Sequence, residues 1–337
     1  MEAASENRHR ERADKFKRLY KESRQEHEEL QRRLQELTEE NRTLHANLLS
    51  TLGEQLQPEQ ADKAADQETY DATVVSFPKS GRTWLSYLYY NYVLQFLPPE
   101  EREQPGETFT YRPEERPEFQ RAIAIAKLLQ RFPRLRFTHG SPGRGKVAYQ
   151  QLKVSGTEFS DGPIILLVRD PRDVVISYYY HVSNPDKGYD LPAGYGISDF
   201  IRSDLFGIRY IIEHMNQWAA ERAKASGPFT ILFYEDLAAQ VEQQFRDFLF
   251  FAGADPVSSR MISVAVEESR FDTLKARELQ HRERSGASTD HNMMRMRRGR
   301  IGGYRDELPD DDIRYLDGQI ASHLDSAFAR YIERDAT

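Results

Sequence analysis

A lysine, an arginine and two hydroxyl side chains surround a single glycine in the first third of the chain. These residues are Lys79, Ser80, Gly81, Arg82 and Thr83. The β-branched run 72–77 predicts a buried strand before them, and the apolar spacing over 82–94 predicts a helix after them. A strand, a glycine turn and a helix N-terminus together hold phosphate, because free N–H groups and the helix dipole face the anion. The segment therefore predicts a phosphate-binding loop.

This loop differs from the phosphate loop of ATP-dependent enzymes. That motif ends in Gly-Lys-Ser/Thr, whose hydroxyl binds Mg²⁺, whereas Lys79 precedes the glycine here. A second segment, 140–147, has the required glycine and lysine spacing, but Val147 stands where the hydroxyl is needed. We interpret 140–147 as a surface or substrate-side loop.

A second cation and hydroxyl pair lies near the middle of the chain. Arg169 follows the apolar run 163–168, which predicts a central parallel strand, and Ser177 lies in a helix predicted through 174–181. Open α/β sheets bind ligands beyond the carboxyl ends of their strands. Arg169 and Ser177 are therefore predicted to face one anion, the alternative being that Arg169 only pairs with Asp173.

A third cationic segment lies near the C-terminus, where five arginines cluster around three glycines. They are Arg295, Arg297, Arg298, Arg300 and Arg305. In a chain of net charge −7, this concentration predicts an anion-binding loop. A nucleic-acid surface is the alternative, but only Tyr304 supplies the aromatic interleaving that single strands need.

The composition narrows the class of protein. The chain has 337 residues, 47 Lys and Arg against 54 Asp and Glu, and no cysteine. Without cysteine there are no disulfides, thiolate metal sites or thiol catalysis, and the acidic balance argues against a nucleic-acid partner. Because no apolar run approaches the roughly 20 residues of a membrane span, and the charged N-terminus is no signal peptide, we expect a cytoplasmic protein with no transmembrane segment.

The N-terminal residues 1–56 have the pattern of a coiled coil. Their heptad positions a and d are Leu30, Leu34, Leu37, Asn41, Leu44 and Leu48. A single Asn at position a fixes the register of a parallel two-stranded coil, so the pattern predicts a homodimer. A helix that packs on its own globular domain is the alternative. The polar stretch 57–70 predicts a linker, and 71–331 predicts one α/β domain.

Together, these motifs resemble the sulfotransferase family that uses 3′-phosphoadenosine 5′-phosphosulfate (PAPS), in its cytosolic and bacterial members. Four segments resemble, in order, the family's 5′-phosphosulfate loop, 3′-phosphate motif, Tyr-Glu-Asp-Leu segment and late Arg-Lys-Gly loop. They are 77–84, 169–177, 233–237 and 297–304. The resemblance implies an α/β fold with a P-loop-type parallel sheet flanked by helices, preceded here by the α-helical coiled coil.

The resemblance also implies a role for each matching residue. Lys79 would contact the bridging and sulfuryl oxygens, and 80–83 would hold the 5′-phosphate. Trp84 would stack on the adenine, with Phe271 and Tyr234 beside it. The 3′-phosphate would be held by Arg169, Ser177, Arg297, Arg298 and Gly299. A dianionic phosphate requires several fixed guanidinium donors, and this group distinguishes PAPS from ATP.

His139 follows a short predicted strand and resembles the family's catalytic base. An imidazole with a pKa near neutrality can take the proton of an acceptor hydroxyl. Two residues depart from the pattern: Phe137 stands where cytosolic members often have a lysine, and Arg82 replaces a common threonine. One cation for the sulfuryl group is therefore lost or supplied elsewhere, and Arg82 is a candidate.

The implied reaction is in-line transfer of a sulfuryl group from PAPS to an acceptor hydroxyl or amine, leaving 3′-phosphoadenosine 5′-phosphate (PAP). No metal is expected, because cationic side chains carry the charge that Mg²⁺ carries in kinases. The acceptor would be a small molecule, lipid or carbohydrate, covered by a mobile loop at 183–207. Two alternatives stay open: an ATP-dependent small-molecule kinase, and a coiled-coil adaptor that binds nucleotide without catalysis.

Overall fold

The computed structural model describes residues 32–33, 70–102, 109–140, 162–185, 189, 191, 194–224 and 227–333. The chain divides into two compact units, Met1–Gln57 and Pro58–Thr337. The predicted coiled coil and linker lie outside the described residues, apart from Arg32 and Arg33, which are helical, and Tyr70. The coiled-coil dimer therefore stays a prediction. Of the glycine-rich segment 140–147, Gly140 alone is among the described residues.

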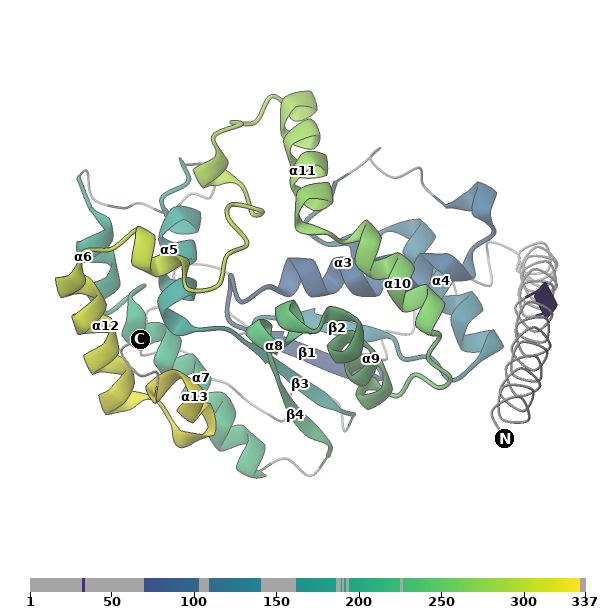
Figure 1. The fold of residues 1–337 in the computed structure, drawn as a ribbon, viewed down its shortest axis with the longest axis horizontal. Helices are drawn as coiled ribbons and strands as arrows, with labels where there is room; N and C mark the ends of the chain where they lie inside the picture. Colours follow the sequence, from purple (N-terminus) through teal and green to yellow (C-terminus); the bar gives the residue numbers. More distant parts are fainter. Residues whose placement is uncertain are drawn as a thin grey trace, which may run out of the picture. The chain divides into compact units, whose positions relative to one another are not determined.

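Four parallel strands form the central sheet of the second unit, in the order β2-β1-β3-β4 (Figure 1). Their bounds are β1 Ala72–Ser76, β2 Leu135–Thr138, β3 Ile164–Val168 and β4 Phe229–Phe233. In the register, Val75 of β1 lies opposite Thr138 of β2 and Leu166 of β3. Every residue of β1 is buried, as the β-branched run predicts for a central strand.

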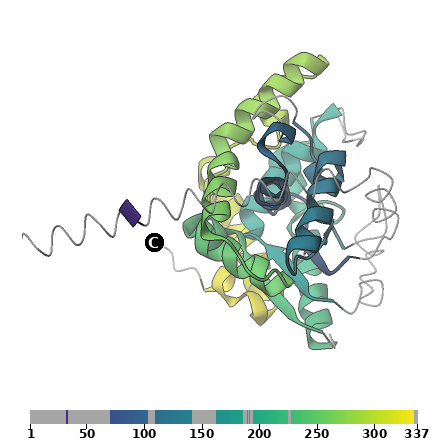
Figure 2. The ribbon, with the colours of Figure 1, turned by 90° about the vertical axis from the view of Figure 1, so that its right-hand side faces the viewer.

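Helices cover both faces of this sheet (Figures 1 and 2). The helices before β4 are α3 Arg82–Val93, α4 Pro117–Leu129, α5 Pro171–Val182, α6 Ile197–Arg202 and α7 Ile208–Lys224. Those after it are α8 Tyr234–Ala239, α9 Val241–Ala252, α10 Ser259–Glu268, α11 Phe271–Ser285, α12 Asp310–His323 and α13 Ala329–Ile332. The predicted α/β fold with a parallel sheet flanked by helices is confirmed. None of the described helices is long and apolar enough to cross a membrane.

Helix α5 begins earlier than the sequence analysis predicted. It starts at Pro171 rather than Val174, and the Asp170 side chain accepts a hydrogen bond from the N–H of Arg172 at 3.0 Å. Proline is well suited to the first helical position, and aspartate to the cap before it. The segment 183–207 also differs from the predicted loop, because α6 forms inside it.

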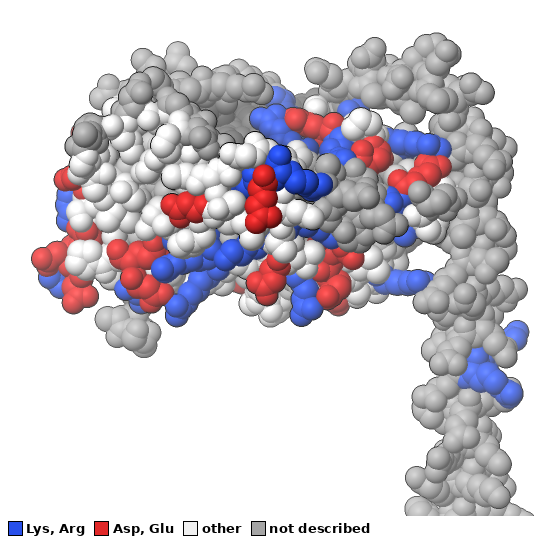
Figure 3. All heavy atoms as spheres, turned by 90° about the horizontal axis from the view of Figure 1, so that it is seen from above, with Lys and Arg blue, Asp and Glu red and all other residues white. Residues whose placement is uncertain are grey.

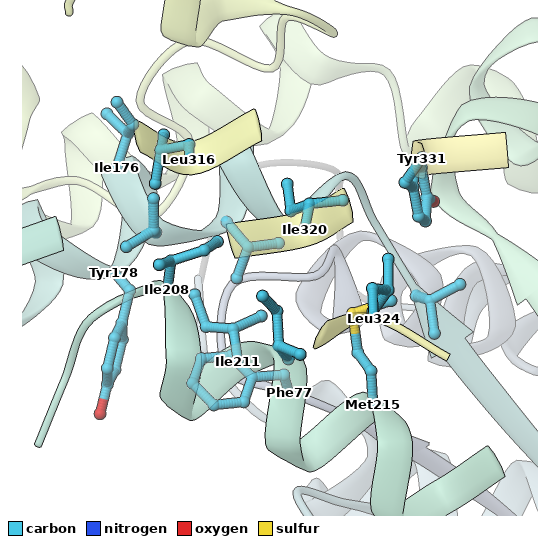
Figure 4. Close-up of a cluster of buried hydrophobic side chains, with 14 of the residues drawn as sticks. Phe77, Ile176, Tyr178, Ile208, Ile211, Met215, Leu316, Ile320, Leu324 and Tyr331 are labelled. Carbon is cyan, nitrogen blue, oxygen red and sulfur yellow. The ribbon is translucent and has the colours of Figure 1, made fainter. Parts of the chain in front are cut away.

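One large apolar cluster packs α5 against α7 and α12 (Figure 4). Its labelled members include Phe77 at the end of β1, Ile176 on α5, Ile211 on α7 and Leu316 on α12. The cluster ties α5 to the residue that opens the predicted phosphate loop. Packing of this kind gives the cationic motifs, which lie far apart in sequence, fixed positions beyond the carboxyl edge of the sheet.

Candidate functional site

The predicted phosphate loop joins β1 to the N-terminus of α3. Gly81 is the N-cap residue with φ +102°, and Lys79 before it also has a positive φ of 75°. A Cβ on Gly81 would lie 2.5 Å from Cδ2 of Tyr234, so only glycine allows this close approach. No side chain caps α3, and its first turn holds no acidic residue. The helix N-terminus is thus left open to an anion.

A cavity of about 410 Å³ opens at this loop, within the size range of small-molecule sites. It brings together all but one of the predicted site residues. They are Lys79, Gly81, Arg82, Thr83, Trp84, His139, Arg169, Ser177, Tyr234, Phe271, Arg297, Arg298 and Gly299. Ser80 is the exception: it is buried and lines a small separate void with Phe77 and His214. Its N–H closes the turn onto the Phe77 carbonyl at 3.3 Å.

Three aromatic side chains, Trp84, Tyr234 and Phe271, line the cavity. The indole N–H of Trp84 donates to the carbonyl of Ser269 at 3.0 Å, and its ring meets Tyr234 edge to face at 5.6 Å. Phe271 lies against Gly299, where a Cβ would come within 2.5 Å of its ring. Fixed aromatic faces of this kind suit a planar base.

Arg169 is held in place at the carboxyl end of β3. Its guanidinium donates to the carbonyl of Arg300 at 2.8 Å, pairs with Asp173 at 3.4 Å and lies 4.6 Å from the ring centre of Tyr234. Arg169 thus makes the pair with Asp173 that the alternative reading expects, and it also lines the cavity with Ser177.

The late arginines are engaged with acids as well as with the cavity. Both terminal nitrogens of Arg297 donate to Glu307 at 2.8 Å, and its guanidinium lies 4.3 Å from the ring centre of Tyr180. Arg298 is more exposed and lies 3.3 Å from Glu307. On the face seen in Figure 3, the described Lys and Arg side chains lie among Asp and Glu. Within the site, Arg297 and Arg298 are each beside the carboxylate of Glu307.

Two buried carboxylates anchor the arginine-rich loop. Asp173 of α5 accepts hydrogen bonds from the N–H groups of Gly302 at 2.8 Å and Tyr304 at 3.2 Å. Glu278 of α11 accepts from the N–H groups of Arg295 and Met296, both at 2.8 Å. Hydrogen bonds from backbone N–H groups to a buried carboxylate are strong. They fix the two ends of the loop, which Figure 1 draws running from α11 back to α5.

Lys79 carries a strongly perturbed ammonium group. Burial, and then the charges of Arg295, Arg297 and Arg169, lower the pKa of Lys79 to about 7, against the opposing effect of Glu278. Among the described residues, no hydrogen bond or ion pair of the ammonium is found. A cation in such surroundings gains stability when an anion binds beside it.

His139 lies directly after β2, and its ring is fixed by the neighbouring strand. Nδ1 of His139 is 2.9 Å from the carbonyl oxygen of Ser76. A carbonyl only accepts hydrogen bonds, so Nδ1 carries the proton and Nε2 keeps its lone pair. Burial, and then the charge of Arg82, lower the pKa of His139 to about 3. The imidazole is therefore neutral at physiological pH, in the state required of a base.

His214, to which the sequence assigned no role, forms a hydrogen bond with the backbone of His139. Its Nε2 donates to the backbone carbonyl of His139 at 3.2 Å, and its ring packs edge to face on Phe77 at 5.4 Å. Burial lowers the pKa of His214 to about 4, so this ring is also neutral. His214 sits within the apolar pattern of α7, and no local feature of the sequence marks it.

Other residues at the site were given no individual role from the sequence. Arg295, Ser269 and Glu307 line the cavity, and Glu278 anchors the loop. Arg295 belongs to the predicted arginine cluster, and that cluster is the one signal in the sequence for it. Within the described residues, no three His, Asp or Glu side chains gather as metal ligands do.

Comparison with known proteins agrees with the fold and identifies the family. A search of curated sequences gives no match. Retinol dehydratase, solved with androsterone and the inactive cofactor PAP, has 19% identity and a TM-score of 0.50, covering 76% of this chain and 81% of its own. Mouse sulfotransferase SULT7A1, solved with PAP, has 21% identity and a TM-score of 0.48, covering 79% and 89%. The sulfotransferase domain matches residues 69–327, most of the chain, so this protein belongs to the sulfotransferase domain family and is a sulfotransferase.

Proposed function

We propose that this sulfotransferase takes its sulfuryl group from PAPS and transfers it to an acceptor hydroxyl or amine, with His139 as the general base. The observation that carries the proposal is the convergence of three unlike groups on one cavity. They are an open helix N-terminus with Lys79, the aromatic side chains of Trp84 and Phe271, and a neutral histidine. PAP bound in the structures of both relatives supports the donor.

The donor set fits a doubly phosphorylated adenine nucleotide. Lys79 and the first N–H groups of α3 would hold the 5′-phosphosulfate, and Arg169, Ser177, Arg297, Arg298 and Gly299 would hold the 3′-phosphate. Trp84, Tyr234 and Phe271 would enclose the adenine. Gly81 and Gly299 leave room where a Cβ would meet Tyr234 or Phe271, so the loops can approach the nucleotide closely.

The chemistry then follows from charge and proton positions. Nε2 of His139 takes the proton of the acceptor as the acceptor oxygen attacks sulfur. The bond between sulfur and the bridging oxygen breaks, and its electron pair stays on the 5′-phosphate of PAP. The Lys79 ammonium, protonated beside the anion, stabilises the negative charge that develops on that oxygen. The low pKa of His139 rises in the complex, because the nucleotide's negative charge offsets that of the arginines.

The acceptor is proposed to be a small molecule, lipid or carbohydrate. Retinol dehydratase binds androsterone in its structure, and an apolar or amphipathic acceptor is compatible with the aromatic side chains packed on Phe77 at the end of β1. Tyr178 and Tyr210 pack together, with ring centres 6.5 Å apart, beside Phe206.

Calorimetric titration with PAP, with adenosine 5′-phosphate and with ATP, each with and without Mg²⁺, tests the donor site. We expect PAP to bind more than tenfold tighter than the nucleotide without a 3′-phosphate, which is about 1.4 kcal/mol, and to do so without Mg²⁺. Preference for ATP with Mg²⁺ would indicate a kinase instead. Release of sulfate or sulfated product from labelled PAPS then separates an enzyme from a nucleotide-binding adaptor.

A further inference from the structure

The position of a family cation is occupied by an aromatic residue in this chain. Phe137 stands two residues before His139, and its ring lies 6.0 Å from that of Tyr89, tilted by 47°. Phe137 is thus packed beside the core and supplies no charge to the transferred group. Under the proposed function, some other cation must face the sulfuryl oxygens between Lys79 and His139.

Arg295 is held in place through both its backbone and its side chain. Its backbone N–H donates to Glu278, which is fully buried, and its guanidinium stacks 4.6 Å from the ring centre of Tyr111. Its Nε is buried and has no hydrogen-bond partner among the described residues. A buried guanidinium N–H without an acceptor is costly, so a ligand oxygen is the natural partner for it.

The surroundings place Arg295 near both Lys79 and His139. Arg295 lines the main cavity with both residues, and it lines a smaller adjoining cavity with Lys79 and Ser177. Its charge is the largest electrostatic contribution to the lowered pKa of Lys79, and it also lowers that of His139. Like charges brought this close destabilise the ligand-free site, and an anion between them removes the repulsion.

Arg82, the replacement suggested by the sequence, lies in a different position. It lines the cavity and is over nine-tenths buried, but Glu114 is the charge that affects its pKa most. Arg82 is the charge that lowers the pKa of His139 most, whereas Arg295 is the charge that lowers the pKa of Lys79 most. The charge of Arg295 acts on both Lys79, which faces the leaving group, and His139, which faces the acceptor.

We propose that Arg295 contacts the sulfuryl oxygens of PAPS and is a catalytic residue, in place of the cation absent at position 137. The inference rests on the proposed function. Arg295 neither gives nor takes a proton: its planar fork of donors neutralises charge on the non-bridging oxygens. Meanwhile the sulfur changes partner from the phosphate oxygen to the acceptor oxygen, and the acceptor proton moves to His139.

The experiment compares two ligands that differ only in the sulfuryl group. Dissociation constants of PAPS and PAP are measured for the wild type and Arg295→Gln, together with the rate at which saturated enzyme releases labelled sulfate from PAPS to water. We expect Arg295→Gln to weaken PAPS at least tenfold while PAP changes less than twofold, and to slow sulfate release by a similar or larger factor. Arg314→Gln, which removes an exposed arginine paired with Asp311, is the matched control and should change neither quantity.

A second variant keeps the proposal testable if the loop itself is disturbed. Phe137→Lys in the Arg295→Gln background returns a cation to the family position and should restore part of the PAPS preference, with thermal unfolding reporting on the fold. Equal weakening of PAP and PAPS, or an unchanged ratio with unchanged sulfate release, overturns the role of Arg295. Failure of the wild type to bind PAP would instead contradict the proposed function.

Discussion

The Nδ1 atom of His139 and the backbone carbonyl of Ser76 are 2.9 Å apart, and this hydrogen bond sets the tautomer of the proposed base. Ser76 ends β1, the same strand that leads into the phosphate loop. One strand end therefore orients the proton acceptor and positions the loop that holds the leaving group. Catalysis by positioned groups depends on fixed geometry of this kind.

Replacing His139 by alanine should separate catalysis from binding. We expect His139→Ala to lower turnover by about 10²–10⁴-fold, the usual contribution of a general base. PAP affinity should change less than twofold, because the neutral imidazole contributes no charge to the nucleotide. Turnover of labelled PAPS and calorimetry with PAP measure the two effects. His323→Ala, on an exposed residue at the end of α12, serves as control, and normal turnover by His139→Ala would rule out this base.

Lys79 should make nucleotide binding depend on pH. In the free protein, burial and neighbouring arginines lower its pKa to about 7, and a bound anion raises the pKa again. Above pH 7 the free protein has lost this proton and the complex retains it, so binding takes up one proton. The association constant for PAP should then fall by up to tenfold per pH unit above pH 7.

Titrations of PAP from pH 6 to 9 measure this slope. The phosphate groups, whose second pKa is about 6, are already ionised above pH 7 and contribute little there. Lys79→Met should bind PAP more weakly and show a flat profile from pH 7 to 9. A wild-type affinity that stays constant over this range would contradict the role of Lys79.

The local elements of the fold were predictable because their signals are local. The β-branched run predicted β1 within one residue, and the glycine turn and apolar spacing predicted α3. The start of α5 was missed although Asp170 and Pro171 carry its capping signal. Helix α6 was missed because the prolines and glycines around it dominate the pattern of 183–207.

The site was predictable in its parts but not in its pairings. The resemblance supplied residues that the structure gathers in one cavity, with Ser80 set apart from it. The partnership of Arg297 with Glu307, the position of Arg295 beside Lys79 and the support from His214 arise from tertiary packing. Periodicity reports the face on which a residue lies, and it carries no information about which distant side chain meets it.

Two glycines with the same backbone conformation should behave differently. Gly299 has φ +61° and would place a Cβ 2.5 Å from the Phe271 ring, whereas Gly286 has φ +69° with nothing within 4 Å of its Cβ. Alanine at either position costs about 1–2 kcal/mol of left-handed strain. Only Gly299→Ala should also displace Phe271, the proposed adenine wall.

Thermal unfolding and PAP titration separate these two effects. Both variants should unfold at lower temperature, while PAP affinity falls at least tenfold in Gly299→Ala and less than twofold in Gly286→Ala. Equal losses of affinity would mean that the contact with Phe271 does not contribute to nucleotide binding.

The bidentate pair between Arg297 and Glu307 should tune recognition of the 3′-phosphate. Both terminal nitrogens of Arg297 donate to the Glu307 carboxylate, so a phosphate that binds there meets a competing negative charge. Glu307→Gln removes this charge and keeps a side chain that can accept a hydrogen bond. We expect PAP to bind about fivefold tighter, on the order of 1 kcal/mol, with adenosine 5′-phosphate unchanged. Asp311→Asn, at an exposed pair, is the control. Weaker binding of PAP by Glu307→Gln would show that the carboxylate acts instead by holding Arg297 in place.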